Sequence, residues 1–321
     1  MSAKLGSNCI VGVDVGGTKI LAGVVDSQHQ VLVRKQIKTP KTNEPIDLVK
    51  VVAELGRNLI AEYPQVQAVG IGVPGFVKRE RVYQAYNIGC DDFAFATPLR
   101  RRLRLPVFVE NDCNLFTLGI HRLEFGGRPK NMVGLFLGTG VGGGLIINGE
   151  LHRGANGTAG ELGQCIVDRN GSKALNSFRG SLESIASHVG LVHHIRSGIR
   201  AGHKTRLQTE LGPNLSGITA DHLRLAMRAG DRLTTHVVQS AGEAVGLGLA
   251  GLISALAPER ITLGGGVMNA LGGTLMPVIR KTVRANVLPG AIEGIRISRT
   301  KLRGDGAIIG AAAWARDNLS A

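Results

Sequence analysis

The sequence predicts an α/β protein that is built from two units. Strand-like apolar runs alternate with segments whose apolar residues recur at helical spacing, as they do in α/β folds. The arrangement of strand, glycine-rich turn and strand occurs twice, at residues 9–25 and again at residues 133–147. This weak internal duplication predicts two α/β units that face each other across a cleft.

The first half of the chain opens as a three-stranded meander. Its apolar runs are short and are separated by turn residues, whereas the helix that follows has apolar residues on one face. The elements expected here are strands at 9–14, 19–25 and 31–37, a helix at 48–63, a strand at 68–73, a helix that ends near 105 and a strand at 107–109.

The pattern restarts near residue 119. The elements expected after it are strands at 133–137 and 145–147 around a glycine turn, helices near 181–197, 219–229 and 231–256, a strand at 260–263 and a helix from about 307 to 318. We therefore expect an N-terminal lobe of residues 1–118, completed by a returning helix at 304–321, and a C-terminal lobe of residues 119–303.

Composition limits the classes of function. No run reaches the ~20 consecutive apolar residues of a membrane span, and the four cysteines are scattered, so we expect a cytoplasmic protein with reduced thiols and no membrane partner. The 38 Lys and Arg against 24 Asp and Glu favour anionic partners such as nucleotides or polyphosphate. With only 4% aromatic residues and no DNA-binding motif, no specific nucleic-acid partner is expected.

The first glycine turn has the residues of a phosphate-binding hairpin. Gly16 and Gly17 lack a Cβ atom, so backbone N–H groups can approach phosphate oxygens, and Thr18 and Lys19 can add donors. Asp14, at the end of the preceding strand, can hold Mg²⁺ directly or through water. The alternative is a plain glycine hairpin with an incidental aspartate.

The second glycine turn spans residues 138–144 and contains the spacing G-x-G-x-x-G. A dinucleotide-binding fingerprint requires a helix after that turn, whereas a strand follows here. A second phosphate-binding hairpin, with Gly138, Thr139 and Gly140 as its contacts, fits better. The chain also lacks the G-x-x-x-x-G-K-[ST] motif of P-loop proteins.

Six motifs occur in order along almost the whole chain. They are DVGGTK (14–19), GVPG (72–75), ENDCN (110–114), LGTGVGGG (137–144), GTAGELGQ (157–164) and LGGGV (263–267). In this order they resemble the ROK family of sugar kinases and repressors, within the actin-like, hexokinase-like ATPase superfamily. The resemblance implies a two-lobed, ribonuclease H-like fold, each lobe having a mixed sheet flanked by helices, with the sugar in the cleft and ATP mainly against the C-terminal lobe. It also implies that Asp14 and Thr18 belong to a first phosphate motif and Gly138 and Thr139 to a second. It also implies an adenosine pocket lined by Gly264, Gly265 and Gly266.

Asp112 is the best candidate for a catalytic base, because it lies at the C-terminal end of the strand predicted at 107–109 and stands beside Asn111. The family carries its catalytic aspartate at this place in the motif. The residues that the resemblance places around the hexose are Gly75, Asn87, Asn111, Asp112, Glu161 and Glu183. Asn87 is the weakest of these, because the family commonly has Trp where this chain has Cys90.

The chain departs from the zinc-containing members of the family. Gln164 stands where they have His, and their three cysteine positions hold Ala174, Asn176 and Ser181. Methyl, amide and hydroxyl groups do not form a tetrahedral zinc site, so we expect no zinc. We expect Gln164 to hydrogen-bond the sugar in place of the family's His, and packing to hold the loop at 165–182, with Phe178 buried.

The reaction predicted is the transfer of the γ-phosphoryl group of ATP to a hexose, with glucose and its 6-hydroxyl as the first choice. The alternatives are a kinase for N-acetylglucosamine or N-acetylmannosamine, polyphosphate as the donor, and a sugar-binding pseudoenzyme with a degraded pocket. We expect an enzyme rather than a repressor, because the first phosphate motif begins at Asp14. The resemblance also implies a homodimer.

Overall fold

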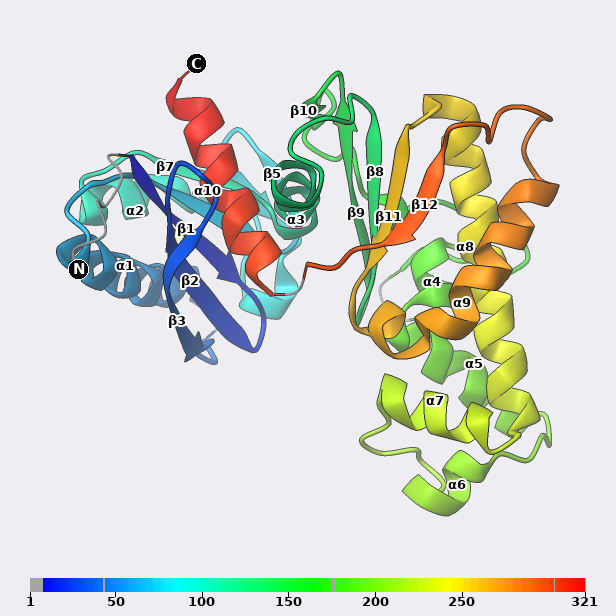
Figure 1. Cartoon of the computed structure of the whole chain (residues 1–321). Helices are drawn as coiled ribbons and strands as arrows, with labels where there is room; N and C mark the ends of the chain where they lie inside the picture. Colours follow the sequence, from blue (N-terminus) through cyan, green and yellow to red (C-terminus); the bar gives the residue numbers. More distant parts are fainter. Residues whose placement is uncertain (1–7, 43, 175–176, 303, 321) are drawn as a thin grey trace, which may run out of the picture. The chain divides into compact units, whose positions relative to one another are not determined.

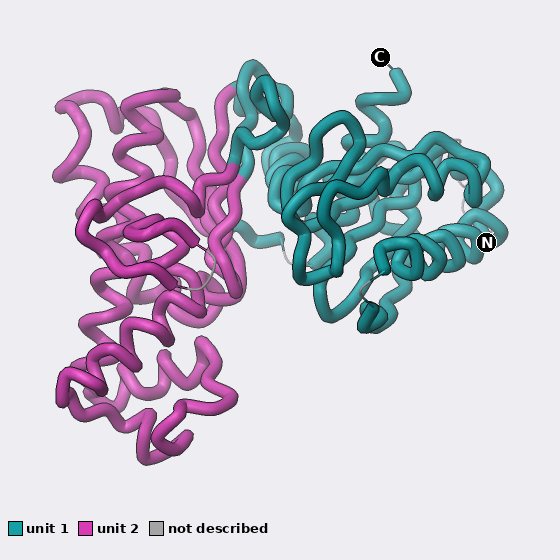
Figure 2. The backbone as a smooth tube through the Cα atoms, turned by 180° about the vertical axis from the view of Figure 1, so that it is seen from behind, with its two compact units in different colours: residues 1–130, 144–160, 300–321 teal, residues 131–143, 161–299 magenta. Residues whose placement is uncertain are grey.

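The chain folds into two compact units in the computed structural model, which describes residues 8–42, 44–174, 177–302 and 304–320. Figure 2 colours the units separately. Unit 1 comprises residues 1–130, 144–160 and 300–321, and unit 2 comprises residues 131–143 and 161–299. Residues 119–130 and 144–160 therefore belong with the N-terminal part of the chain.

The elements of both units are labelled in Figure 1. The strands are β1 (Cys9–Val15), β2 (Lys19–Val25), β3 (Val31–Lys38), β4 (Val66–Val73), β5 (Phe76–Lys78), β6 (Arg81–Tyr83), β7 (Val107–Asn111), β8 (Met132–Leu137), β9 (Val141–Ile147), β10 (Glu150–Leu151), β11 (Arg260–Gly264) and β12 (Arg296–Arg299). The α-helices are α1 (Pro45–Glu62), α2 (Ala96–Leu103), α3 (Asp112–Gly119), α4 (Leu182–Ala186), α5 (His188–Arg200), α6 (Arg206–Leu211), α7 (Ala220–Arg228), α8 (Arg232–Leu256), α9 (Gly266–Ala285) and α10 (Asp305–Leu319). Short 3₁₀ segments occur at η1 (Tyr86–Ile88) and η3 (Leu162–Gln164), and a π-helical turn at η2 (Ile120–Glu124).

The sheet of unit 1 has the strand order β3-β2-β1-β4-β7. β1, β2 and β3 form the antiparallel meander, whereas β1, β4 and β7 run parallel. The register pairs Asp14 with Gly72, and Gly72 with Glu110. The carboxyl ends of three strands therefore meet at one edge, which is where open α/β sheets bind ligands.

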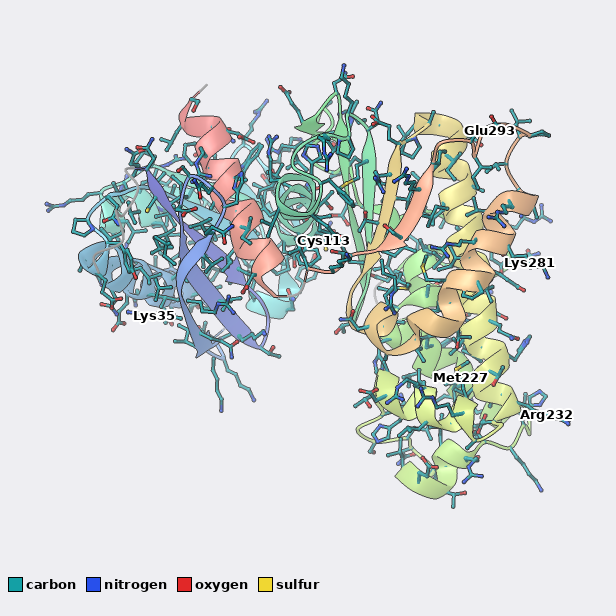
Figure 3. All side chains as sticks on the ribbon, viewed as in Figure 1. Lys35, Cys113, Met227, Arg232, Lys281 and Glu293 are labelled. Atoms are coloured by element: carbon teal, nitrogen blue, oxygen red, sulfur yellow. The ribbon has the colours of Figure 1, made fainter. Side chains whose placement is uncertain are left out.

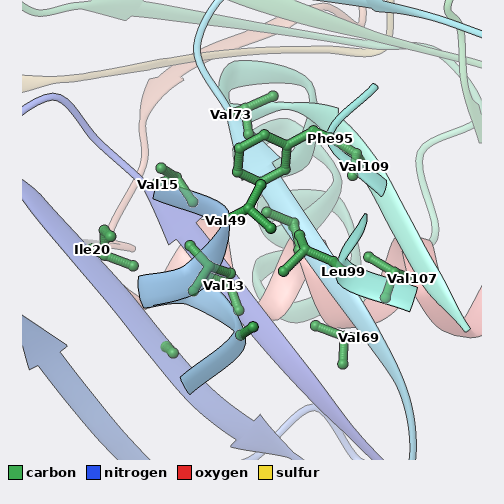
Figure 4. Close-up of a cluster of buried hydrophobic side chains, with 14 of the residues drawn as sticks. Val13, Val15, Ile20, Val49, Val69, Val73, Phe95, Leu99, Val107 and Val109 are labelled. Carbon is green, nitrogen blue, oxygen red and sulfur yellow. The ribbon is translucent and has the colours of Figure 1, made fainter. Parts of the chain in front are cut away.

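Helices cover both faces of this sheet. Alternate side chains of β1 point to opposite faces, so Val13 joins the core under α1 and α2, whereas Ile10 packs toward α10. Figure 4 shows the first of these cores, with Phe95 and Leu99 against the valines of the sheet.

The backbone of α10 lies directly against two glycines of the sheet. A Cβ atom added to Gly12 would lie 2.0 Å from the carbonyl oxygen of Ile308, and one added to Gly70 would lie 1.8 Å from that of Ala311. Only glycine permits this approach, so two residues in the first quarter of the chain are adapted to its last helix.

The second five-stranded sheet has the order β10-β9-β8-β11-β12, which repeats the order of the first sheet and agrees with the predicted duplication. The boundary between the units falls within β9. Long helices α8 and α9 pack together, and α4 and α5 pack on α8. Within the described residues, α8 has the length and apolar composition of a membrane span, and 56% of its most apolar window is buried inside the protein.

The predicted strands and most predicted helices are confirmed, with three corrections. The helix expected at 181–197 is broken at Ser187, which has extended backbone angles and separates α4 from α5. The strand after the second glycine turn begins at Val141 instead of Leu145. The helix expected to end near 105 ends at Leu103.

Candidate active site

Two carboxylates lie at the same edge of the first sheet. Asp14 is near the end of β1, and Asp112 is the first residue of α3, directly after β7. The Asn111 side chain accepts a hydrogen bond from the Asn114 N–H (2.9 Å) and so caps α3. Asp112 Oδ1 accepts a hydrogen bond from the N–H of Cys113 (2.8 Å), a residue labelled in Figure 3.

The electrostatic environment sets these carboxylates apart. Burial, together with the nearby Asp112 carboxylate and against the opposing effect of Lys19, raises the pKa of Asp14 to about 7. Burial also raises the pKa of Asp112, against the hydrogen bond from the Cys113 N–H. Paired carboxyl groups with pKa values moved toward neutrality are typical of sites that exchange protons or bind cations.

The first glycine hairpin differs in one detail from the prediction. The Gly16 N–H donates to the Lys19 carbonyl at 3.0 Å and so closes the hairpin itself. Gly17, Thr18 and Lys19 of this turn are exposed. A Cβ atom on Gly17 would lie 3.1 Å from the backbone oxygen of Asn87, so this predicted sugar residue adjoins the hairpin.

Gly75 and Asn111 also come together in unit 1. The Asn111 Nδ2 group donates to the Gly75 carbonyl at 2.7 Å. Gly75 has a φ of +76°, and a Cβ atom there would lie 2.1 Å from the carbonyl oxygen of Tyr83, so glycine is required. Unit 1 thus holds Asp14, the first hairpin, Gly75, Asn87, Asn111 and Asp112.

Glu183 joins a predicted sugar residue to the second glycine hairpin within unit 2. Its Oε2 atom accepts a hydrogen bond from the Val141 N–H (2.9 Å), and its Oε1 atom accepts one from Gln164 Nε2 (3.3 Å). A Cβ atom on Gly140 would lie 2.5 Å from Glu183 Oε2, so the glycine makes room for this carboxylate. The Gly138 N–H closes this hairpin on the Gly140 carbonyl (2.9 Å).

Two more predicted residues border the same cluster. Thr139, at the tip of the second hairpin, is exposed. Glu161 is also exposed and precedes η3, where its carbonyl accepts the N–H of Gln164 at 3.1 Å. Unit 2 therefore brings Glu161, Gln164 and Glu183 close to the second glycine hairpin.

The loop at 165–182 is held by hydrogen bonds, and the expected burial of Phe178 is wrong. The Phe178 side chain is 65% exposed, and its N–H donates to Gln164 Oε1 (3.5 Å). The Val167 N–H donates to the Gly180 carbonyl (3.0 Å), and Arg179 Nε donates to the Gly171 carbonyl (2.8 Å). Packing of an aromatic ring is unnecessary because backbone pairing already closes this loop. Asn176 lies outside the described residues.

The third glycine segment connects β11 to α9. Gly265 has a φ of +92°, and a Cβ atom there would lie 2.4 Å from the Leu137 carbonyl oxygen. Gly266 then begins α9, and Gly264 ends β11. The N–H groups at the start of a long helix suit an anionic ligand such as a nucleotide phosphate.

The carboxylates of unit 1 fit magnesium better than a closed metal site. In the described part of the chain, no group of three or more His, Cys, Asp or Glu side chains is placed to hold a metal. Mg²⁺ commonly binds through one or two carboxylates together with water and substrate phosphates. Asp14, with Asp112 beside it, supplies donors of that kind.

Sequence reasoning missed one buried pair next to the predicted base. Glu110 is fully buried and forms an ion pair with Arg153, which lies after β10. The quoted motif ENDCN contains Glu110, and a carboxylate inside an otherwise apolar strand was a signal that it needs a partner. Nothing in the local sequence identified Arg153 as that partner.

Comparison with known proteins identifies the family. The family model described as ROK family matches residues 10–318. The chain belongs to the ROK family. The glucokinase of Halalkalibacterium halodurans is 33% identical over 94% of this chain and 92% of its own. The ROK family glucokinase of Streptomyces griseus, solved with glucose and AMPPNP, is 32% identical and superposes with a TM-score of 0.77, over 96% of this chain and 99% of that one.

A further relative carries a different sugar in its name. The N-acetyl-D-glucosamine kinase of Pasteurella multocida is 29% identical over 94% of this chain and 97% of its own. The relatives of this chain thus include proteins named glucokinase and one named N-acetyl-D-glucosamine kinase.

Proposed function

We propose that this ROK protein is an ATP-dependent hexose kinase that phosphorylates glucose at the 6-hydroxyl. The observation that carries the proposal is the position of Asp112, which follows β7 directly beside Asn111 and interacts with Asp14. Similarity at 32% identity to a glucokinase that was solved with glucose and an ATP analogue supports the choice of both substrates.

In the reaction, the sugar hydroxyl oxygen forms a bond to the γ-phosphorus while the bond to the bridging oxygen of ADP breaks. Asp112 accepts the hydroxyl proton, and its raised pKa brings a carboxylate closer to the strength that a general base needs. Asp14 would hold Mg²⁺, which neutralises charge on the transferred phosphoryl group. The glycine hairpins orient the phosphates, because positioning dominates this chemistry.

Each unit contains candidate groups for the sugar. Asn111 and the Gly75 turn are tied together in unit 1, and Glu183 and Gln164 are tied together in unit 2. Glu183 keeps two hydrogen bonds although the described residues form no metal-binding group, which favours an active kinase over a pseudoenzyme with a degraded pocket.

The second candidate function is an N-acetylhexosamine kinase. It is favoured by the similarity to the N-acetyl-D-glucosamine kinase of Pasteurella multocida. A coupled assay of ADP release over a panel of hexoses, including glucose, N-acetylglucosamine and N-acetylmannosamine, separates the candidates through their kcat/KM values.

The control for this assay is Asp112→Asn, which removes the proposed base and nearly preserves the side-chain shape. We expect kcat to fall by about 10²- to 10⁴-fold. Release of ADP with none of the sugars would refute the proposed kinase, and an unchanged kcat in the variant would refute the role of Asp112. Replacing ATP by polyphosphate tests the other donor: turnover that is steeply inhibited by salt would favour it, and lack of turnover would remove it.

A further inference from the structure

The ion pair between Glu110 and Arg153 lies immediately behind the proposed catalytic turn. The Glu110 side chain has 0% exposure, and Arg153 is 33% exposed. A buried carboxylate without a cation is strongly unfavourable, so this pair has to be maintained in the folded protein. Glu110 precedes Asp112 by two residues, and the site described above gives neither member of the pair a role.

Glu110 holds the turn that carries the proposed base. Its Oε1 atom accepts hydrogen bonds from the Asn111 N–H (2.8 Å) and from Asn114 Nδ2 (3.0 Å). Asn111 and Asn114 are themselves joined through the helix cap, so one carboxylate oxygen organises both ends of the first turn of α3. Asp112 is enclosed in that turn.

Arg153 fixes the other oxygen of Glu110 and is itself fixed by two further contacts. Its guanidinium donates to the Val77 carbonyl at 3.1 Å and lies over the Trp314 ring, 5.4 Å from the ring centre. Strand β5, helix α10 and the end of β7 therefore meet at a single side chain. A planar, forked cation that also stacks on an aromatic ring is a role for which Arg is suited and Lys is not.

The backbone around Arg153 is docked as well. A Cβ atom on Gly157 would lie 2.2 Å from the Val77 carbonyl oxygen, so the segment at 152–157 packs against β5 without room for a side chain. Gly75 directly precedes β5, and its carbonyl accepts a hydrogen bond from the side-chain amide of Asn111. Strand β5 therefore links Arg153 to the proposed sugar residues.

We propose that Arg153 is a positioning residue for phosphoryl transfer, acting through Glu110 to hold Asn111 and Asp112 in the geometry that accepts the sugar proton. The inference rests on the proposed kinase function. Arg153 does not touch the substrates in this scheme, so its removal affects kcat more than the binding of either substrate. Burial raises the pKa of Glu110, and the Arg153 guanidinium opposes that shift.

The test compares Arg153→Met with Arg153→Lys and with the wild type, all as full-length protein, after wild-type turnover has been established. We expect Arg153→Met to lower kcat by about 10²-fold with KM for sugar and ATP changed by less than about threefold, because small displacements of a reacting group are costly. Arg153→Lys keeps the positive charge but lacks the forked guanidinium and its stacking on Trp314. Its kcat is therefore expected to lie between those of the wild type and Arg153→Met.

A double variant keeps the test decisive if Arg153→Met alone fails to fold. Glu110→Gln with Arg153→Met removes both charges together and leaves an amide oxygen for Asn111 and Asn114. The inference expects a folded protein with kcat at least about 10-fold below wild type, because nothing orients that amide. A folded double variant with wild-type kcat would overturn it, and so would a fall in affinity alone in the single variants.

The matched control is Arg34→Met. It breaks the exposed ion pair between Arg34 and Asp305 in the same unit, and Arg34 belongs to no part of the proposed site. Its kcat is expected to stay within about twofold of wild type, because exposed ion pairs contribute little. If the wild type itself lacks kinase activity, the proposed function fails. If the wild type is an active kinase and the Arg153 variants have the same kcat, only this inference fails.

Discussion

Asp14 and Asp112 act on each other at the edge of the first sheet, although β4 separates the strands that carry them. Their proximity follows from the parallel register of β1, β4 and β7, which brings the three strand ends together. Because the Asp112 carboxylate raises the pKa of Asp14, a change at Asp112 alters the pKa of Asp14.

Stability should depend on pH through Asp14. Its folded pKa of about 7 lies above the ordinary value of 3.8, so the stabilisation it contributes is complete below pH 3.8 and is lost as the pH rises through 7. Asp14→Asn cannot ionise and escapes this loss. We expect the Tm of the variant minus that of the wild type to be larger at pH 8 than at pH 5, measured by thermal unfolding without Mg²⁺ or nucleotide. Equal differences at both pH values would contradict the raised pKa.

Gly140→Ala should damage the second half of the site. The added Cβ atom would lie 2.5 Å from Glu183 Oε2 and displace the carboxylate from the Val141 N–H. We expect the free energy of unfolding to fall by about 1–3 kcal/mol, together with a higher KM for the sugar. Gly138→Ala is the control for stability, because its nearest new neighbour would be 3.9 Å away. Similar unfolding free energies for the two variants would count against the role of Gly140.

Zinc should be absent from protein that is purified without added metal. The loop at 165–182 is closed by its own hydrogen bonds, and the positions of the family's zinc ligands hold residues that do not bind the metal. We expect far less than one zinc per chain by elemental analysis, and an unchanged Tm after chelation followed by return of Mg²⁺. One zinc per chain, or a fall in Tm on chelation, would disprove this prediction.

Two glycine substitutions should have opposite effects on stability. Gly70→Ala would place a methyl group 1.8 Å from the Ala311 carbonyl oxygen, so α10 would have to move, at a cost of about 3 kcal/mol. Gly273→Ala, on the exposed side of α9 with nothing within 4 Å, should instead stabilise the protein by about 0.5–1 kcal/mol. Denaturant unfolding measures both, and a Gly70→Ala protein as stable as wild type would show that the contact is not required.

Local sequence patterns predicted much of the fold, because the periodicity of apolar residues is strong wherever one face of a helix or strand is buried. The meander of β1, β2 and β3, the helix α1 and the glycine hairpins all follow from short-range periodicity or from turn residues. The parallel neighbours of β1 could be placed only through the family resemblance, since nothing in a strand's sequence names its partner.

Other elements were hidden by residues that usually interrupt helices. Helix α9 contains Pro277 and several glycines, yet its buried residues, among them Leu271, Leu275 and Ile279, recur at helical spacing. Conversely, Ser187 breaks a segment that looks continuously helical, because its hydroxyl accepts the Gly190 N–H (2.9 Å) and starts a new helix.

The residues of the candidate site also fall into those that the sequence reveals and those that only the folded structure reveals. Asp14, Asp112 and the glycine turns stand out in the sequence because each has a chemical purpose that its residue type reveals. Arg153 does not, because its partner Glu110 is distant along the chain and only the folded backbone brings them together.

The close seating of α10 on Gly12 and Gly70 bears on how the chain matures as it is made. Strands β1 and β4 emerge from the ribosome early, but the helix that shields their second face is translated long after them, so the first sheet waits with apolar surface uncovered until α10 has been made. Synthesis of α10 is thus the step at which this half of the protein can close its core.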